Sequence, residues 1–547
     1  MAKKLFLFCI LNFQFFLFAQ QEDAWVYLTD KPTDTYPIND PSAFLTQKAI
    51  DRKVKHGVTI DVRDVPVNEL YITALKNATG ITVMAKSKWF NAVHIRGTET
   101  NINDLRINPS TSSFVDRIDF ADKSLNTTKI IKEKAIFKIK DKFEVEKAFV
   151  NFTYGNTQNQ VDMINVDDLH VADYTGNGVT IAVLDAGFIN VNTMGAFQRI
   201  RDAGDLLGGY DFVSRNPDVY ANTSSSHGTQ VLSTMAGYIL NSYVGTAPDA
   251  SYYLFITEDS ADENPVEESY WVEAVERADS LGVDLINTSL GYKDYSPNYP
   301  NYSYTSAQMD GNTAFITKGA NIAFEKGLLL VTSVGNEGNS GVGAPADSQY
   351  TLAIGAVNSA GSYATFSSVG SANQPSQKPD VVAQGQSSAV INPSNSIGTN
   401  NGTSFSSPIL AGGIACLMQA LPNKTNAEIM QLVRESGSQF STPDFQLGYG
   451  IPNLMDALNS SLSVDDFGKM NDISIYPNPG KEFIYFKIPS TENKLTITFF
   501  DVLGKQILQY SINSANNQVD ISSLSKGIYI INAKSKNNVK SFKFIKN

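Results

Sequence analysis

Histidine is the residue that most often serves as a general base near neutral pH, and this chain contains only four of them. One of the four, His227, stands in the segment Ser-His-Gly-Thr-Gln-Val. The glycine after it permits close approach of the backbone, and the apolar residues that follow predict a packed helix. A lone histidine of this kind most often only caps a loop. A catalytic role for His227 therefore requires partners elsewhere in the chain.

Two other polar residues follow apolar runs directly. Asp185 ends the run Val179–Leu184, and Asn336 follows the run 328–334 in Ser-Val-Gly-Asn-Glu-Gly. The carboxyl end of a buried strand is where parallel sheets place functional groups. A carboxylate there could orient an imidazole and stabilise its protonated form, and a side-chain amide could donate to an oxyanion. Taken singly, an aspartate that ends a strand and a Gly-Asn turn are the more ordinary interpretations.

Ser404 lies in Asn-Gly-Thr-Ser-Phe-Ser-Ser-Pro, directly before an apolar stretch rich in alanine and glycine. That stretch predicts a buried helix with Ser404 at its N-terminus, where free amides and the helix dipole favour a developing negative charge. Gly402 permits a tight entry, and we expect Pro408 near the first turn, where a missing N–H costs least. Serine is also a common helix N-cap, so this segment alone is only suggestive.

Together the segments appear in the order Asp, His, Ser, which is one of the known orders of a catalytic triad. All of them resemble the subtilisin-like serine protease (subtilase) family, over about residues 154–458. The segments Asn287-Thr-Ser-Leu-Gly291 and Gly448-Tyr-Gly-Ile-Pro-Asn453 match as well. The pair of motifs His-Gly-Thr and Gly-Thr-Ser-x-x-x-Pro is highly specific. The resemblance implies a secreted endopeptidase that hydrolyses peptide bonds through an acyl-enzyme.

By this resemblance, Ser404 is the nucleophile, His227 the base and acid, Asp185 the orienting carboxylate and Asn336 the oxyanion donor. Such a donor contributes about 3 kcal/mol to lowering the barrier, a figure measured on subtilisin itself. The substrate-binding residues would be Ser289, Leu290 and Gly291, which would pair with an extended substrate backbone.

One departure concerns the tyrosine-rich stretch 292–312 beside this proposed cleft. It could reshape substrate preference, so cleavage specificity is not carried over from the family.

The elements that must position these residues alternate between strand and helix over 151–460, the expected peptidase domain. Apolar runs at 179–184, 283–290, 328–334 and 352–357 predict buried strands, and 270–281 predicts a helix. This alternation indicates an α/β fold, with a mainly parallel, subtilisin-like sheet flanked by helices on both faces. The gap of 42 residues between Asp185 and His227 suggests an inserted surface loop.

The first 20 residues are typical of a secretory signal peptide. Lys3 and Lys4 precede a mainly apolar run from Leu5 to Phe18. That run is short for a membrane anchor, which needs roughly 20 residues, and we expect no transmembrane anchor elsewhere. After removal of this segment Cys416 is the only cysteine, and we interpret it as a small buried hydrophobe.

Residues 21–150 show an α+β pattern, with strands expected at 81–84 and 92–95 and a helix at 67–75. The position of this region, and the segment Trp89-Phe-Asn-Ala-Val, resemble a subtilase propeptide. The resemblance implies a zymogen whose propeptide aids folding and inhibits the enzyme. A permanent accessory domain is the alternative.

A polar linker at 461–471 precedes a region, 472–547, whose short apolar and aromatic runs predict an all-β sandwich. The segments Ile475-Tyr-Pro-Asn-Pro479 and Ile521-Ser-Ser-Leu-Ser-Lys-Gly-Ile-Tyr529 resemble the C-terminal sorting domain of type IX secretion in Bacteroidetes. The resemblance implies that the secretion machinery is a partner, and that the protein passes the periplasm and outer membrane to become secreted or surface-located. A binding sandwich for substrate or carbohydrate is the alternative.

The composition limits the other classes of function. The chain has 547 residues, 42% of them hydrophobic, and a net charge of −12. An acidic chain without a basic stripe does not favour nucleic acid, so protein or peptide substrates are the expected partners. The chemistry needs no cofactor and we assign no metal ligand. Structural calcium is common in the resembling family, but no clear oxygen-ligand loop supports it here.

Two rival functions use the same residues. One is a catalytically silent subtilase fold that serves as a surface adhesin or binding protein. The other is an esterase, since acyl transfer needs the same groups. The intact Asp, His and Ser positions disfavour the first, and the lack of a Gly-x-Ser-x-Gly segment disfavours the usual fold of the second.

Overall fold

The computed structural model describes residues 20–125, 152–299, 301–462, 473–488, 494–501, 506–514, 516–534 and 539–547. The predicted signal peptide and nearly all of the predicted linker lie outside the described residues. The chain divides into two compact units, residues 1–458 and 459–547. The first unit contains the residues that the sequence singles out for chemistry.

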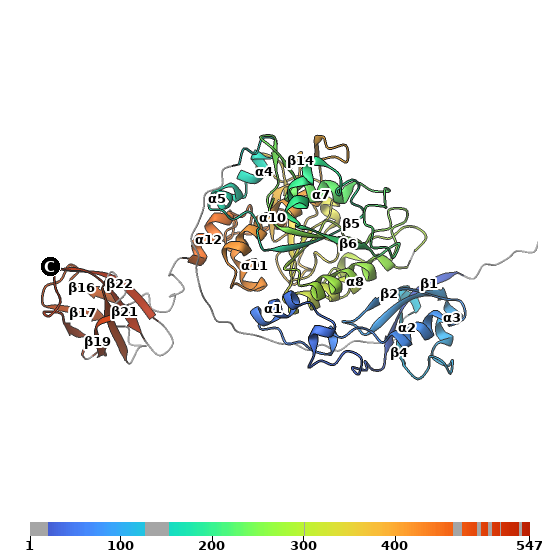
Figure 1. Ribbon diagram of the computed structural model, residues 1–547, viewed down its shortest axis with the longest axis horizontal. Helices are drawn as coiled ribbons and strands as arrows, with labels where there is room; N and C mark the ends of the chain where they lie inside the picture. Colours follow the sequence, from blue (N-terminus) through green and yellow to red (C-terminus); the bar gives the residue numbers. More distant parts are fainter. Residues whose placement is uncertain are drawn as a thin grey trace, which may run out of the picture. The chain divides into compact units, whose positions relative to one another are not determined.

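The first unit is built on a seven-stranded sheet of order β13-β12-β11-β10-β5-β9-β6 (Figure 1). Every pair of neighbours in it is parallel, so the predicted parallel α/β fold is confirmed. Its strands are β5 (Thr180–Asp185), β6 (Leu206–Asp211), β9 (Ser251–Ile256), β10 (Leu285–Thr288), β11 (Leu329–Ser333), β12 (Leu352–Val357) and β13 (Val381–Gln384).

Helices cover both faces of this sheet. In β5, Ile181 and Val183 belong to a core with helices α7 (His227–Ala236) and α10 (Thr403–Ala420). The alternate residues of the strand pack into a second core with α8 (Val266–Leu281) and α9 (Phe315–Glu325). Because both faces are buried, the central strands contain continuous apolar runs in place of an alternation of apolar and polar residues.

The strand order reverses direction at β5. The next two strands in the sequence, β6 and β9, lie on one side of it, and β10 to β13 lie on the other. Such a point leaves a crevice at the carboxyl ends of the strands, and ligands of parallel α/β sheets bind there. The expected surface loop accounts for only part of the sequence between Asp185 and His227. The gap also contains helix α6 (Gln198–Ala203) and the edge strand β6.

The N-terminal region forms an antiparallel sheet of order β2-β3-β1-β4, and the expected strands and helix are confirmed. Its strands are β1 (Gln21–Leu28), β2 (Ile81–Ser87), β3 (Ala92–Thr98) and β4 (Val115–Phe120), with helices α1 (Gln47–Lys55), α2 (Glu69–Lys76) and α3 (Glu99–Asp104). Helices α2 and α3 pack on one face of this sheet. The other face lies against α8 and α9 (Figure 1), where the ring of Trp25 stacks on that of Phe315 at 4.7 Å.

A buried ionic cluster joins this N-terminal region to α8. The carboxylate of Asp279 pairs with Arg52, with Lys53 at 2.8 Å and with Lys88 at 3.3 Å. Lys53 also pairs with Asp64 at 3.0 Å and is completely buried. Burial opposes the ionised form of Asp279, but the positive charges of Lys88, Lys53 and Arg52 outweigh it and lower the pKa of that carboxyl. The carboxylate of Asp279 therefore stays ionised inside the interface.

The second unit contains two antiparallel sheets around one apolar core, in agreement with the predicted all-β region. One sheet has the order β16-β17-β20 and the other β19-β18-β21-β22. The strands are β16 (Ser474–Tyr476), β17 (Phe483–Lys487), β18 (Leu495–Phe500), β19 (Gln506–Ile512), β20 (Gln518–Asp520), β21 (Gly527–Lys534) and β22 (Val539–Lys546). In the described parts of both units, no helix has the length and apolarity that a membrane span requires.

The buried cluster generates a first prediction. In a Ser404→Ala chain, we expect Asp279→Asn to weaken the attachment of residues 21–125 by roughly 3–5 kcal/mol, because it leaves buried cations without their counter-charge. The matched control is Glu325→Gln. It removes an exposed pair, Glu325 with Arg63 at 3.0 Å, from the same interface and should cost less than about 1 kcal/mol. Hydrogen exchange of the β1–β4 amides measures both values, and equal effects would contradict the importance of the cluster.

Candidate active site

Asp185 and His227 meet in the crevice at the carboxyl end of β5. Asp185 is the last residue of that strand and is completely buried, and His227 is the first residue of α7. The imidazole Nδ1 lies 2.8 Å from Oδ1 and 3.0 Å from Oδ2 of the carboxylate. Burial disfavours the charged imidazole, but the adjacent charge of Asp185 and its hydrogen bond outweigh burial and raise the pKa of His227. The imidazole is therefore oriented with Nε2 as its remaining proton acceptor.

Gly228 makes this approach possible. A Cβ atom at this position would lie 2.6 Å from the carbonyl oxygen of Gly187 and 2.9 Å from the Cβ of Asp185. Any side chain there would push α7 away from β5. The glycine that follows the histidine in the sequence thus serves the close backbone approach that its residue type predicts.

Ser404 is the second residue of α10 and is nearly buried. Gly402, directly before the helix, has φ of 146°, a backbone conformation that only glycine adopts readily. The hydroxyl of Ser404 donates to the carbonyl oxygen of Ser289 at 3.2 Å. The ring of the next residue, Phe405, lies with its centroid 5.9 Å from that of His227, so the start of α10 lies beside the first residue of α7.

The position of Pro408 differs from the expectation. It is the sixth residue of α10, beyond the first turn, and it lacks the N–H that would normally bond to the carbonyl of Ser404. The hydroxyl of Ser289 donates to that carbonyl instead, at 2.9 Å. Because Pro408 has no N–H, the carbonyl of Ser404 lacks its usual helical donor and can accept from Ser289. This bond connects the start of α10 to the segment after β10.

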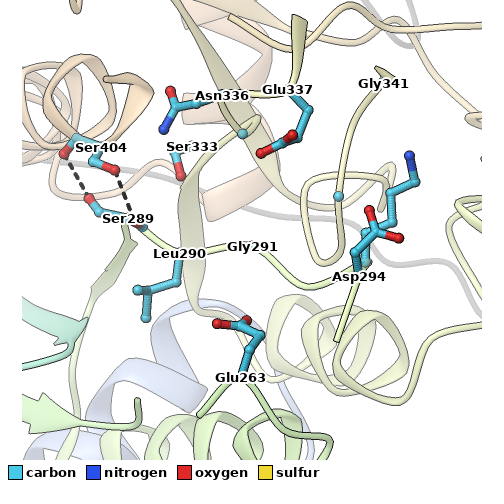
Figure 2. Close-up of a pocket in the computed structure, with 13 residues that line it drawn as sticks. Glu263, Ser289, Leu290, Gly291, Asp294, Ser333, Asn336, Glu337, Gly341 and Ser404 are labelled. Atoms are coloured by element: carbon cyan, nitrogen blue, oxygen red, sulfur yellow. Dashed lines mark hydrogen bonds between the residues drawn. The ribbon is translucent and has the colours of Figure 1, made fainter. Parts of the chain in front are cut away.

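Asn336 follows β11 and reaches the start of the same helix. Its side-chain Oδ1 accepts from the backbone N–H of Thr403 at 2.9 Å and from the Thr403 hydroxyl at 3.1 Å. These two donors fix which side of the amide carries the oxygen. The amide Nδ2 is left as a donor, and Figure 2 shows Asn336 on the side of the cavity where Ser404 lies.

A cavity of about 360 Å³ adjoins Ser404 (Figure 2), and Ser289, Leu290, Gly291 and Asn336 line it. The sequence-predicted substrate residues thus lie together at one cavity. The structure adds three acidic lining residues that sequence reasoning missed. Of these, Glu337 directly follows Asn336 and Asp294 lies in the tyrosine-rich stretch, so both were near a recognised signal. No sequence signal indicated Glu263.

Three tyrosine hydroxyls of the stretch 292–312 donate hydrogen bonds to buried glutamates. Tyr292 donates to Glu258, and Tyr304 donates to Glu268 at 2.9 Å. Tyr302 donates to Glu22 of the N-terminal region at 2.6 Å. The stretch therefore contacts both the wall of the cavity and the N-terminal region, which the sequence alone did not indicate.

Comparison with known protein families divides the chain into three parts. Residues 176–450 match the subtilase family, residues 23–136 match the peptidase S8 propeptide domain of Bacteroidota, and residues 474–547 match the secretion system C-terminal sorting domain. The sorting domain indicates secretion by the type IX system to the cell surface or the extracellular space. The N-terminal sheet is therefore part of a propeptide, as its resemblance predicted.

The chain is also similar to individual proteins. Subtilisin NAT from Bacillus subtilis subsp. natto is 34% identical over 304 residues, which cover 54% of this chain and 70% of the relative. Subtilisin from Bacillus pumilus is 33% identical over 304 residues, covering 54% of this chain and 97% of the relative. Among solved structures, proteases from Pseudoalteromonas arctica align with a TM-score of 0.43 and 22% identity, over 57% of this chain and 100% of theirs.

The family match spans half of the chain and includes all three residues of the Asp, His, Ser order. Both subtilisins are about one third identical to this chain over 304 residues. The protein is a serine-type endopeptidase with a propeptide and a secretion sorting domain, and the chain belongs to the subtilase family.

Proposed function

We propose that Ser404, His227 and Asp185 form the catalytic triad and that the reaction proceeds through an acyl-enzyme on Ser404. The observation that carries this proposal is the hydrogen bond from His227 Nδ1 to the buried Asp185, at 2.8 Å, beside the N-terminus of α10. This bond holds the imidazole in the orientation in which Nε2 accepts a proton. The bond also stabilises the imidazolium that forms during the reaction.

The steps follow from the chemistry of these groups. His227 Nε2 takes the hydroxyl proton as Ser404 Oγ bonds to the scissile carbonyl carbon, and a tetrahedral oxyanion results. The imidazolium then gives that proton to the leaving amine nitrogen, the C–N bond breaks, and the acyl-enzyme remains. Water, deprotonated by His227, hydrolyses the ester and restores the Ser404 hydroxyl.

The first step requires a change at Ser404. Its hydroxyl donates to the carbonyl of Ser289 at 3.2 Å in the free protein and must turn to Nε2 of His227. Catalytic hydrogen bonds are often loose before substrate binds and tighten in the complex. The exposed edge at Leu290 and Gly291 would pair with an extended substrate backbone, which would place the scissile carbonyl over Ser404.

The oxyanion would be stabilised by two kinds of donor. Asn336 Nδ2 is one, since Oδ1 of the same amide is already engaged by Thr403. The free backbone N–H groups in the first turn of α10 are the other. These residues supply nucleophile, base and oxyanion donors, so we propose that the chemistry itself needs no cofactor.

The mature enzyme is proposed to arise from this chain by three cuts. Residues 1–20 would leave as a signal peptide and 21–150 as a propeptide. Residues 151–460 would remain as the peptidase domain after the linker 461–471 is cut and the sorting domain, 472–547, is lost.

The nucleophile can be tested with a fluorophosphonate serine probe. We expect the processed wild-type protein to be labelled and the Ser404→Ala variant to remain unlabelled, because only an activated serine attacks this reagent at neutral pH. Gel fluorescence with mass spectrometry of the labelled peptide provides the measurement. Absence of labelling in folded, processed protein would contradict the triad and favour a silent fold.

The base can be tested through its pKa. His227 acts only when neutral, so kcat/KM should rise with pH through a pKa above the ordinary histidine value of about 6.5. In a Ser404→Ala background, Asp185→Asn should lower that pKa, because it removes the negative charge that stabilises the imidazolium. With only four histidines in the chain, NMR titration of the ring protons can follow each one. An unchanged His227 pKa in the Asp185→Asn variant would refute the assigned pairing.

The backbone approach at the site can be tested by Gly228→Ala. The added methyl would collide with Gly187 and Asp185, so we expect the rate of probe labelling to fall about 100-fold. Gly195→Ala adds the same methyl where its nearest neighbour atom lies at 3.5 Å, and it should label at the wild-type rate. Equal labelling of the two variants would show that the close approach is not needed.

A further inference from the structure

The cavity beside Ser404 carries an excess of negative charge. Three carboxylates line it, those of Glu263, Asp294 and Glu337, against the single ammonium of Lys293. The three acids come from different segments, which follow β9, β10 and β11 respectively. Figure 2 shows Glu263 and Glu337 on opposite sides of the segment through Leu290 and Gly291, with Asp294 further along it. The negative charge therefore belongs to the cavity as a whole and not to one loop.

The single lysine does not neutralise these acids. The ammonium of Lys293 donates to the carbonyl oxygen of Ser340 at 2.6 Å. Among the described residues, the structure records no ion pair for Glu263, Asp294 or Glu337. Two buried acids elsewhere in this unit, Asp279 and Asp380, each contact a cation. The cavity acids are thus available to a positive charge from outside the chain.

A buried group of acids lies behind Glu263. Ligand oxygens of Glu258, Glu263 and Glu267 all lie within 4.8 Å of one another. Burial raises the pKa of Glu258 to about 8 and that of Glu267 to about 10, so both are protonated at neutral pH. A cation that enters from the cavity side would favour their ionised forms.

The shape of the cavity also suits a long side chain. In Figure 2, Ser404 lies at one end of the lining residues and Asp294 at the other, with Leu290 and Gly291 between them. Gly341 and Gly343 line the cavity without side chains of their own. An alkyl stem could therefore pass along Leu290 while its charged end reaches the carboxylates, as lysine and arginine do elsewhere.

From this cavity we propose that the enzyme selects peptide substrates with a lysine or arginine side chain beside the scissile bond, with Asp294 and Glu337 as the residues that determine this specificity. The inference rests on the proposed function, because it places the cavity next to the nucleophile. An ammonium or guanidinium there would gain charge-assisted hydrogen bonds to carboxylates that are otherwise unpaired. A neutral side chain of the same length would gain only the apolar contact.

The experiment uses processed protein from the full chain and matched fluorogenic peptides. Arginine, lysine, norleucine or glutamate is placed in turn at each of the four positions before the scissile bond. We expect kcat/KM to be about 10- to 100-fold higher for arginine or lysine than for norleucine at the position directly before the scissile bond, and lowest for glutamate. A basic preference only at a more distant position would overturn the proposed placement. The preference should shrink as salt is raised, because salt screens a partly exposed charge.

The variants identify the residues. The double variant Asp294→Asn, Glu337→Gln should reduce the preference for arginine over norleucine, measured as the ratio of their kcat/KM values, about tenfold or more. Glu337→Lys should move the preference towards glutamate. Asp456→Asn, an exposed acid on α12 (Leu454–Leu462) outside the cavity, should keep the wild-type preference. Loss of norleucine cleavage as well would mean that the double variant damages the site, and Glu337→Lys alone then decides.

Probe labelling of the same samples separates the two proposals. If Ser404 is labelled and the peptides are cleaved without any preference for a basic residue, the charge selection is overturned while the triad stands. If Ser404 is not labelled in folded, processed protein, the proposed function has failed and the inference falls with it.

Discussion

A carboxylate buried without a partner is among the most costly groups that a protein interior can contain, and Asp185 is completely buried at the end of β5. Its hydrogen bond to His227 solves this problem and also fixes much of the surrounding geometry. The bond requires α7 to begin directly beside β5, and that approach is possible only because Gly228 has no side chain. The pairing of buried Asp185 with His227 thus determines where α7 begins and which nitrogen of the imidazole is free. It also requires a glycine directly after the histidine.

The other half of the site depends on a comparable constraint at α10. Pro408 cannot donate to the carbonyl of Ser404, so that carbonyl accepts from the hydroxyl of Ser289. At the other side, Asn336 accepts from the first N–H of the helix. The ends of β10 and β11 are therefore tied to the helix start by the carbonyl that Pro408 leaves free and by the first N–H, which any helix leaves unsatisfied. The strands that supply the substrate-binding edge and the oxyanion donor are held in register with Ser404 by these bonds.

Sequence reasoning found the polar residues that end strands and start helices, because their types are uncommon against apolar runs. Asp185, Asn336 and Ser404 each adjoin such a run, and the parallel sheet follows from the same runs. It could not find Glu263, because a glutamate between a strand and a helix is ordinary and only the cavity gives it meaning. It misplaced Pro408 for a related reason. The periodicity of an apolar, alanine-rich segment does not show where the first turn begins.

The propeptide interface follows a different physical logic from the core of the peptidase. Few interfaces bury lysine completely, yet Lys53 is completely buried between Asp64 and Asp279. The buried carboxyl group of Glu276 accepts hydrogen bonds from the backbone N–H groups of Lys88 and Trp89, at 2.8 and 3.0 Å. A charge is costly to bury alone, and Asp279 has its cationic partners on the other side of the interface. Once the propeptide leaves, Asp279 and Glu276 of α8 lose these partners and meet water, where ionised groups are well solvated. This polar part of the interface holds while it is complete and leaves a hydrated surface when it separates, unlike the apolar contact of Trp25 with Phe315 beside it. Polar burial therefore suits a segment that must first be held and later be released.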